Sequence, residues 1–89
     1  MTERKIESAL AKQAKDAGGL ALKLISPGVA GLPDRLVLLP GGRILFVELK
    51  RHGEKPRPLQ RKRHRQIAAL GFIVLIIDSV EAIQEVFDQ

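Results

Sequence analysis

In the first half of the chain, hydrophobic residues repeat every three or four positions in one segment, as in a helix, and every second position in another, as in a strand. Over residues 3–17 apolar side chains fall three or four positions apart, which predicts an amphipathic helix with Thr2 as its N-cap. Residues 20–25 alternate between apolar and other side chains, as in a short strand. Residues 35–39 and 43–50 predict two further strands, and the Pro-Gly-Gly turn between them predicts a hairpin.

The second half of the chain predicts two helices around one more strand. Pro58 suits the first turn of a helix, because that position needs no amide hydrogen, and residues 59–70 continue as a strongly basic helix. Residues 72–77 are consecutive apolar residues, which predicts a strand covered on both faces. Asp78 and Glu81 resemble a capping box at the start of a last helix that runs nearly to the end of the chain.

The resulting order of elements, α-β-β-β-α-β-α, predicts an α/β fold. We expect a mixed four-stranded sheet flanked by helices on both sides. We also expect a single domain over residues 1–89, because a chain of 89 residues is far shorter than the length at which a core divides. A domain of this size is marginally stable by itself, and self-association would help it.

The composition argues against several classes of protein. Hydrophobic residues make up 45% and charged residues 28% of the chain, the balance of a globular protein. The absence of Cys excludes disulfides and thiolate metal sites. We find no apolar run long enough for a membrane span and no signal peptide, so we expect a cytoplasmic location. Trp and Tyr are absent, which argues against binding single strands by aromatic stacking.

Positive charge is concentrated in one stretch of the chain. The formal net charge is +5, yet between Lys50 and Arg65 there are eight basic residues and one acid, whereas the segment from Gly71 onward holds four acids and no base. A single Lys or Arg is usually just solvated, but a block of this density favours a polyanionic partner. The residues expected to contact that partner are Arg51, Lys55, Arg57, Arg61, Lys62 and Arg65.

Three polar residues fall at the ends of the two predicted hairpin strands. Glu48 and Lys50 share one face of their strand, and by themselves could form only a structural ion pair. Asp34 opens the preceding strand, where it could equally be a turn residue after Pro33. Antiparallel pairing brings the start of one strand to the end of the next, so we expect Asp34 beside Glu48. Two converging carboxylates repel each other unless a cation lies between them, and their oxygens favour Mg²⁺ or Mn²⁺.

These residues resemble the signature of the PD-(D/E)xK nucleases, in which a Pro-Asp pair is followed by Glu-x-Lys on the next strand. The wider sequence is similar to the VRR-NUC (virus-type replication-repair nuclease) branch in its standalone form. The resemblance implies a restriction-endonuclease-like αβββαβα core. It extends over residues 28–34, 46–50, 58–60 and 71–80, whereas the Val-Arg-Arg triplet associated with the family name is absent.

The resemblance also implies roles for individual residues. The catalytic residues that it implies are Asp34, Glu48, Lys50, Gln60 and Glu7. Asp34 and Glu48 would bind the metal, with the backbone carbonyl of Leu49 as a further ligand. A glutamate on the first helix completes the family pattern, and Glu7 fits best, as a direct or indirect ligand. Glu3 is its rival, and either could simply be an acid favoured by the helix dipole.

The histidine of the basic helix carries less information than these acids. His64 lies four residues after Gln60 and therefore on the same helical face. Such a histidine could touch a phosphate, but a solvent-facing position is the commoner case, and we expect His64 to face solvent.

The resemblance therefore predicts a bacterial or phage-type Mg²⁺-dependent DNA endonuclease, with Mn²⁺ able to substitute. It implies a homodimer that acts on branched DNA such as four-way (Holliday) junctions, with a role in DNA repair. Two alternatives remain open. One is a basic DNA- or RNA-binding module of the same fold that has lost catalysis. The other is an RNA-associated basic protein in which Glu48 and Lys50 form only a structural pair.

Overall fold

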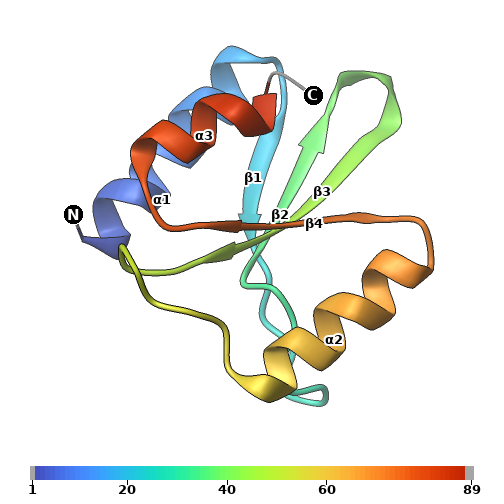
Figure 1. The fold of residues 1–89 in the computed structure, drawn as a ribbon. Coiled ribbons are helices and arrows are strands. Elements are labelled where there is room, and N and C mark those ends of the chain that lie inside the picture. Colours follow the sequence, from blue (N-terminus) through green and yellow to red (C-terminus); the bar gives the residue numbers. More distant parts are fainter. Residues whose placement is uncertain (1, 88–89) are drawn as a thin grey trace.

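The computed structural model describes residues 2–87 and contains a mixed four-stranded sheet with helices on both faces (Figure 1). In chain order the elements are α1 (Glu3–Asp16), β1 (Leu20–Lys23), β2 (Arg35–Leu39), a 3₁₀ turn (Pro40–Gly42), β3 (Arg43–Leu49), α2 (Pro58–Ala69), β4 (Ile73–Ile77) and α3 (Val80–Phe87). The predicted order of elements and the α/β class are confirmed. None of the helices described is long and apolar enough to cross a membrane.

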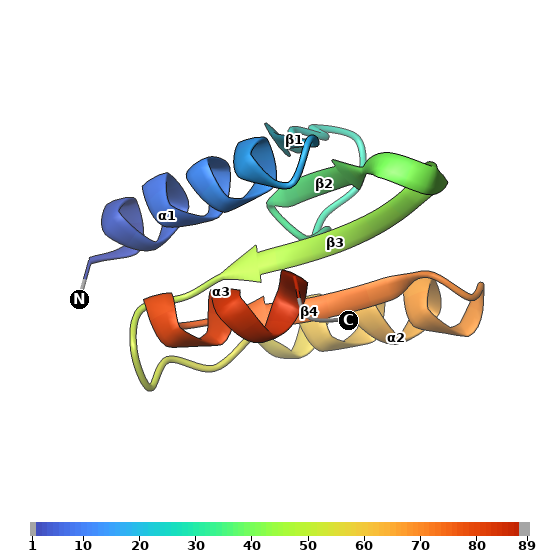
Figure 2. The same ribbon diagram turned by 90° about the horizontal axis from the view of Figure 1, so that it is seen from above.

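The sheet has the order β1-β2-β3-β4. The first three strands form an antiparallel meander, in which Arg35 lies opposite Val47. β4 pairs in parallel with β3, and α2 provides the crossover that such a connection requires (Figure 2). Because β2 and β3 are antiparallel, the start of β2 and the end of β3 lie at the same end of the sheet, near the start of α2.

The hydrophobic core lies between one face of the sheet and the helices α1 and α3. Ile6, Leu10 and Ala14 recur along α1 at helical spacing and are buried there. They pack with alternate strand residues and with the inner side of α3: Val37, Leu39, Leu45, Val47, Leu49, Ile77, Ile83 and Val86. Burial of each large aliphatic side chain contributes about 1.5–3 kcal/mol, so this layer holds the sheet in shape.

The opposite face of the sheet is only partly covered, because α2 packs mainly on β4. The strand residues on this side are Leu20, Leu22, Leu36, Leu38, Ile44 and Phe46, which we call the open apolar face. The expectation that residues 72–77 are covered on both faces is wrong, since Ile73 and Ile76 are exposed. β4 is an edge strand, and its two neighbouring helices leave part of it uncovered.

The helix starts show one cap that was predicted and one that was not. Thr2 caps α1 as predicted, because its hydroxyl accepts a hydrogen bond from the Lys5 amide at 3.3 Å. α3 is capped by Ser79, whose hydroxyl accepts from the Ala82 amide at 3.2 Å, so the assignment of Asp78 as the cap is wrong. Asp78 instead accepts a hydrogen bond from the Gly53 amide at 3.2 Å and ties the 51–57 loop to the end of β4.

Candidate active site

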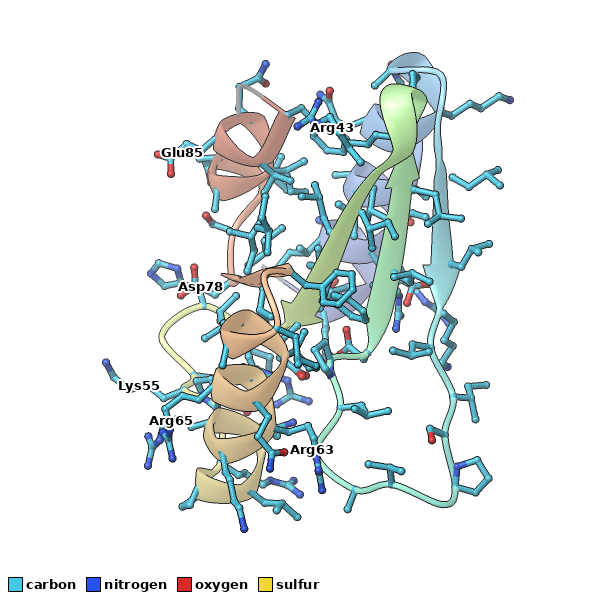
Figure 3. The ribbon with its side chains drawn as sticks, turned by 90° about the vertical axis from the view of Figure 1, so that its right-hand side faces the viewer. Arg43, Lys55, Arg63, Arg65, Asp78 and Glu85 are labelled. Atoms are coloured by element: carbon cyan, nitrogen blue, oxygen red, sulfur yellow. The ribbon has the colours of Figure 1, made fainter. Side chains whose placement is uncertain are left out.

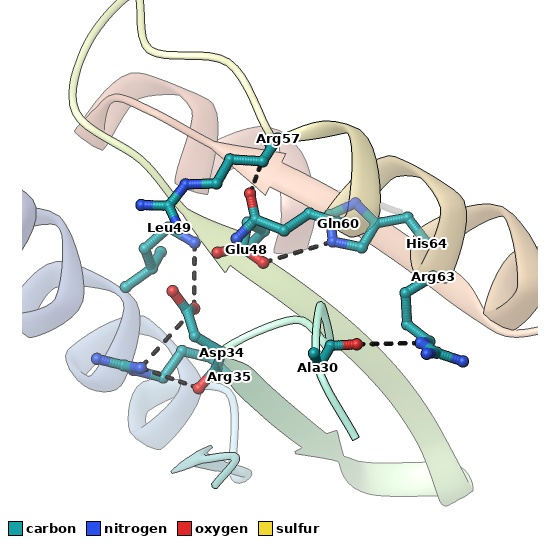
Figure 4. A network of polar contacts seen from close by, with 9 residues as sticks. All are labelled: Ala30, Asp34, Arg35, Glu48, Leu49, Arg57, Gln60, Arg63 and His64. Atoms are coloured by element: carbon teal, nitrogen blue, oxygen red, sulfur yellow. Dashed lines mark hydrogen bonds and ion pairs between the residues drawn. The ribbon is translucent and has the colours of Figure 1, made fainter. Parts of the chain in front are cut away.

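The β2–β3 hairpin brings Asp34 and Glu48 together, as the spacing predicted. Asp34 immediately precedes Arg35, which pairs with Val47, so Asp34 and Glu48 face each other across the ends of the two strands. The Leu49 amide donates a hydrogen bond to Asp34 Oδ1 at 3.1 Å and fixes that carboxyl against the neighbouring strand (Figure 4). The pairing of the strands thus sets the relative position of the two carboxyl groups.

Burial and mutual repulsion oppose ionisation of both carboxyl groups. The pKa of Asp34 is raised from 3.8 to about 7, first by burial and then by the negative charge of Glu48, although the Leu49 amide acts in the opposite direction. The pKa of Glu48 is also raised by burial, against the lowering effects of its hydrogen bond to Asp34 and the charge of Lys50. A cation between the carboxylates would relieve this repulsion.

A buried contact between Glu48 and His64 forms the inner wall of the site. Glu48 Oε1 lies 3.4 Å from His64 Nε2, and within the described chain neither atom has a hydrogen-bond partner. The expectation that His64 faces solvent is wrong, because the side chain points from α2 onto the sheet and is 8% exposed. Burial and the nearby charge of Lys50 lower the pKa of His64. The Glu48 carboxylate therefore has an oxygen with spare acceptor capacity.

A cavity of about 390 Å³ opens in front of these residues and is lined by Glu48, Leu49 and Lys50. No three His, Asp or Glu side chains converge as a ready metal cluster anywhere in residues 2–87. Mg²⁺, however, needs only one or two carboxylates, with water and substrate phosphate as its other ligands. Asp34, Glu48 and the Leu49 carbonyl, with the spare acceptor on Glu48, fit a hard divalent cation of this kind.

The first helix presents Glu3, and not Glu7, to the cavity. Glu3 is part of the cavity lining, and its negative charge contributes to the raised pKa of both Asp34 and Glu48. Glu7 is half-exposed and forms an ion pair with Arg35. The preference for Glu7 over Glu3 as the helix carboxylate at the cavity is therefore not what the structure shows.

Gln60 lies in the first turn of α2, one turn before His64. Its Oε1 accepts a hydrogen bond from the Arg57 amide at 2.8 Å and so closes the start of the helix. The Arg57 side chain extends from the same point towards the end of β3 and lines the cavity (Figure 4). Gln60 thus holds the beginning of α2 over the site, and its role as a catalytic residue stays a prediction.

The predicted DNA-binding residues surround the cavity or extend from α2. Arg51, Lys55 and Arg57 line the cavity, and Arg61 lines a second hollow of about 430 Å³ next to it. All six predicted side chains are exposed: Arg51, Lys55, Arg57, Arg61, Lys62 and Arg65. No ion pair joins any of them to an acid in residues 2–87. Their charges are therefore available to a polyanion.

Arg63 belongs to the same basic block but faces the other way. Figure 3 shows Lys55 and Arg65 on one side of α2 and Arg63 on the other. Arg63 Nε donates a hydrogen bond to the Ala30 carbonyl at 3.2 Å, which holds the loop between β1 and β2 against α2. Gly31 makes this approach possible, because it has a φ of +83° and a Cβ there would lie 2.9 Å from the Leu59 carbonyl oxygen.

Arg35 is a residue of the site that sequence reasoning missed. It is 9% exposed, and its Nη1 donates to the Asp34 carbonyl at 2.9 Å. The strand pattern contained a signal, since Arg35 occupies the same face as the core residues Val37 and Leu39. A charge at a core position needs a partner, and here the partners are acids.

Comparison with known proteins gives consistent results. No family model matches the chain. It is similar to the "Putative nuclease p44" of Acyrthosiphon pisum secondary endosymbiont phage 1, with 49% identity over 77 residues that cover 86% of this chain and 83% of that protein. A solved structure described as "VRR_NUC domain" has a TM-score of 0.91 and 32% identity, covering 98% of this chain and 95% of the other. A second, described as "VRR_NUC domain protein", has a TM-score of 0.77 over 100% and 87% of the two chains, and its 20% identity bears on the fold alone.

Proposed function

Because this chain belongs to the VRR-NUC family of nucleases, we propose that it hydrolyses phosphodiester bonds in DNA as a metal-dependent endonuclease. One observation carries the proposal: Asp34 meets Glu48 at the strand ends, and Glu48 and Lys50 line a cavity that basic side chains surround. Carboxyl groups whose pKa values are raised by burial and by each other are typical of sites built for a cation or a proton.

Each residue of the site has a chemical task in this reaction. Asp34, Glu48 and the Leu49 carbonyl would hold Mg²⁺ or Mn²⁺, which when bound supplies acidification of water and stabilisation of phosphate charge. Lys50 lines the cavity and contributes a positive charge towards the negative charge that develops on the phosphate. His64 closes the inner side against Glu48.

The exposed basic side chains would position the DNA backbone. Arg51, Lys55 and Arg57 lie at the cavity, and phosphate contacts of this type fix the register of DNA without reading its bases. Recognition by backbone position suits a substrate defined by its shape, and we therefore propose branched DNA such as a four-way junction.

We further propose that the protein acts as a homodimer. The open apolar face supports this proposal, because Leu20, Leu22 and Ile44 are exposed on it. An antiparallel sheet with one solvated face normally carries polar residues there, whereas this face is aliphatic and aromatic. Two active sites in one dimer would allow two strands of a junction to be cut in a coordinated way.

A cleavage assay tests the proposed function. Purified protein is incubated with end-labelled four-way, flap and linear DNA in Mg²⁺, in Mn²⁺ and in EDTA, with Glu48→Gln as the inactive control. We expect cuts within the strands of branched DNA only when a divalent cation is present. Binding in EDTA without any metal-stimulated cutting would favour a module that has lost catalysis. Tighter binding to RNA than to DNA would favour an RNA-associated protein.

A further inference from the structure

Arg35 joins the first helix to the start of β2 through three contacts. Its Nη1 donates to the Asp34 carbonyl at 2.9 Å and lies 3.7 Å from Asp34 Oδ1. Its Nη2 forms an ion pair with Glu7 Oε2 on α1. The guanidinium group therefore lies between Asp34, an acid of the candidate metal site, and Glu7, an acid outside it. Figure 4 shows its contacts with Asp34.

The burial of Arg35 sets it apart from an ordinary surface ion pair. Its side chain is 11% exposed, whereas that of Glu7 is 50% exposed, so the cation is buried and its anchor is half in water. Burial of a charge costs free energy unless its partners compensate, and an aliphatic residue would serve the core better at this position. An arginine at position 35 is explained if its charge and its planar donor group act on an adjacent residue.

Asp34 is the neighbour on which Arg35 acts. Asp34 Oδ1 already accepts the Leu49 amide at 3.1 Å, and the Arg35 guanidinium approaches the same oxygen. The hydrogen bond from Leu49 and the positive charge of Arg35 act on the same oxygen, which restricts rotation of the carboxyl group. Arg35 thus contacts Asp34 twice, at its backbone carbonyl and beside its carboxyl group.

We propose that Arg35 is a positioning residue that orients Asp34 for the divalent cation, and that Glu7 serves the site by anchoring Arg35. The inference rests on the proposed function, because it assumes that Asp34 is a metal ligand. Glu7 would then act on the site through Arg35 and would not bind the metal itself. A small cavity of about 150 Å³ beside Glu7, Lys23 and Arg35 leaves the guanidinium free to move when its anchor is removed.

The test measures Mn²⁺ affinity by calorimetry in the wild type, Arg35→Lys, Arg35→Met and Glu7→Gln. A lysine keeps the charge but cannot reach Asp34 and Glu7 together, and residues that orient metal ligands typically affect affinity about 10- to 100-fold. We expect Arg35→Met and Arg35→Lys to weaken Mn²⁺ binding at least about tenfold, and Glu7→Gln to weaken it less. Glu7→Gln in the Arg35→Met background should have no further effect, because the two residues act in series.

Asp16→Asn is the matched control, because it removes an acid from the exposed Lys12–Asp16 ion pair on the same helix. It should leave Mn²⁺ affinity unchanged. DNA binding in EDTA should stay within about twofold of wild type in every variant, which shows that the fold is intact. If Arg35→Met does not fold, Arg35→Lys and Glu7→Gln decide the matter.

Two results would overturn the inference and can be told apart from failure of the proposed function. If wild type binds Mn²⁺ and cuts DNA but folded Arg35 and Glu7 variants bind Mn²⁺ normally, Arg35 is only a structural ion-pair partner. The same conclusion follows if Asp16→Asn weakens Mn²⁺ binding as much as Glu7→Gln does. If wild type itself neither binds Mn²⁺ nor cuts DNA, the proposed function fails.

Discussion

Replacing Asp34 by Asn should stabilise the metal-free fold at neutral pH while it removes the cation site. The pKa of Asp34 in the folded chain is raised from 3.8 to about 7, chiefly by burial. The folded carboxyl therefore keeps its proton over a pH range in which the unfolded one has lost it. The stability that Asp34 contributes is complete below about pH 4 and is lost as the pH rises through about 7.

The size of the effect follows from the pKa difference. At about 1.4 kcal/mol for each pH unit, a pKa raised from 3.8 to about 7 corresponds to about 4 kcal/mol at alkaline pH. The Asp34 side chain retains 30% exposure, which reduces this cost because water screens the charge. Asparagine keeps an oxygen that can accept the Leu49 amide. We therefore expect Asp34→Asn to gain about 1–3 kcal/mol at pH 8 and almost nothing at pH 4.

Urea unfolding of wild type and Asp34→Asn in EDTA from pH 4 to 8 measures this difference. The pKa of His64 is lowered by burial, so the stability that His64 contributes is lost as the pH falls below about 6.5, opposite to the effect of Asp34. Because both proteins contain His64, its contribution cancels to first order in the difference between them. Adding Mn²⁺ should stabilise wild type and not the variant. DNA binding in EDTA should be equal or tighter in the variant, and cleavage in Mg²⁺ should fall by orders of magnitude. A variant that is less stable than wild type at pH 8, or a difference that does not change with pH, would refute the reasoning.

Four further outcomes are expected. Glu48→Ala and Lys50→Ala should each reduce cleavage at least about a hundredfold with DNA binding retained, as gel-based cleavage and mobility-shift assays would show; cutting at the wild-type rate would mean that the site is wrong. Reversing Arg61 and Arg65 to Glu should reduce the slope of log affinity against log salt by about 2, whereas reversing Lys12 and Lys15 on α1 should not; equal slopes would place the DNA surface elsewhere. Gly31→Ala should cost at least about 2 kcal/mol in thermal unfolding, because its Cβ would meet the Leu59 carbonyl, and Gly41→Ala, with a φ of +82° but open space around it, should cost about 1 kcal/mol. Sedimentation should give twice 9.8 kDa for wild type and about 9.8 kDa for Leu22→Glu, since a charge on the open apolar face prevents self-association, and a wild-type mass of 9.8 kDa at micromolar concentration would contradict the homodimer.

The elements and the paired carboxylates could be predicted because they depend on local sequence patterns. Periodicity locates α1, and a short turn dictates that β2 and β3 pair with Asp34 opposite Glu48. Local signals also explain the errors at caps, where Asp78 and Ser79 are both good N-cap residues and only the tertiary contact of Asp78 with Gly53 decides between them.

The parts of the site that could not be predicted depend on how distant elements pack. His64 is buried only because α2 crosses the sheet directly over Glu48, and a helix this rich in cations has too weak an apolar stripe to predict its orientation. The choice between Glu3 and Glu7 depends on how far α1 extends beyond the strand ends, since the two residues lie one helical turn apart.

The location of both carboxylates on one hairpin has a consequence for the order of folding. Asp34 and Glu48 are joined by a short antiparallel connection, so the entropy lost on bringing them together is small. α2 and β4, which supply His64 and much of the basic surface, are added through the longer parallel crossover. Contacts between residues close in sequence form earlier than contacts between distant ones. The carboxylate pair should therefore assemble in a species that cannot yet hold DNA, and competence to cut should arise only when the crossover helix docks.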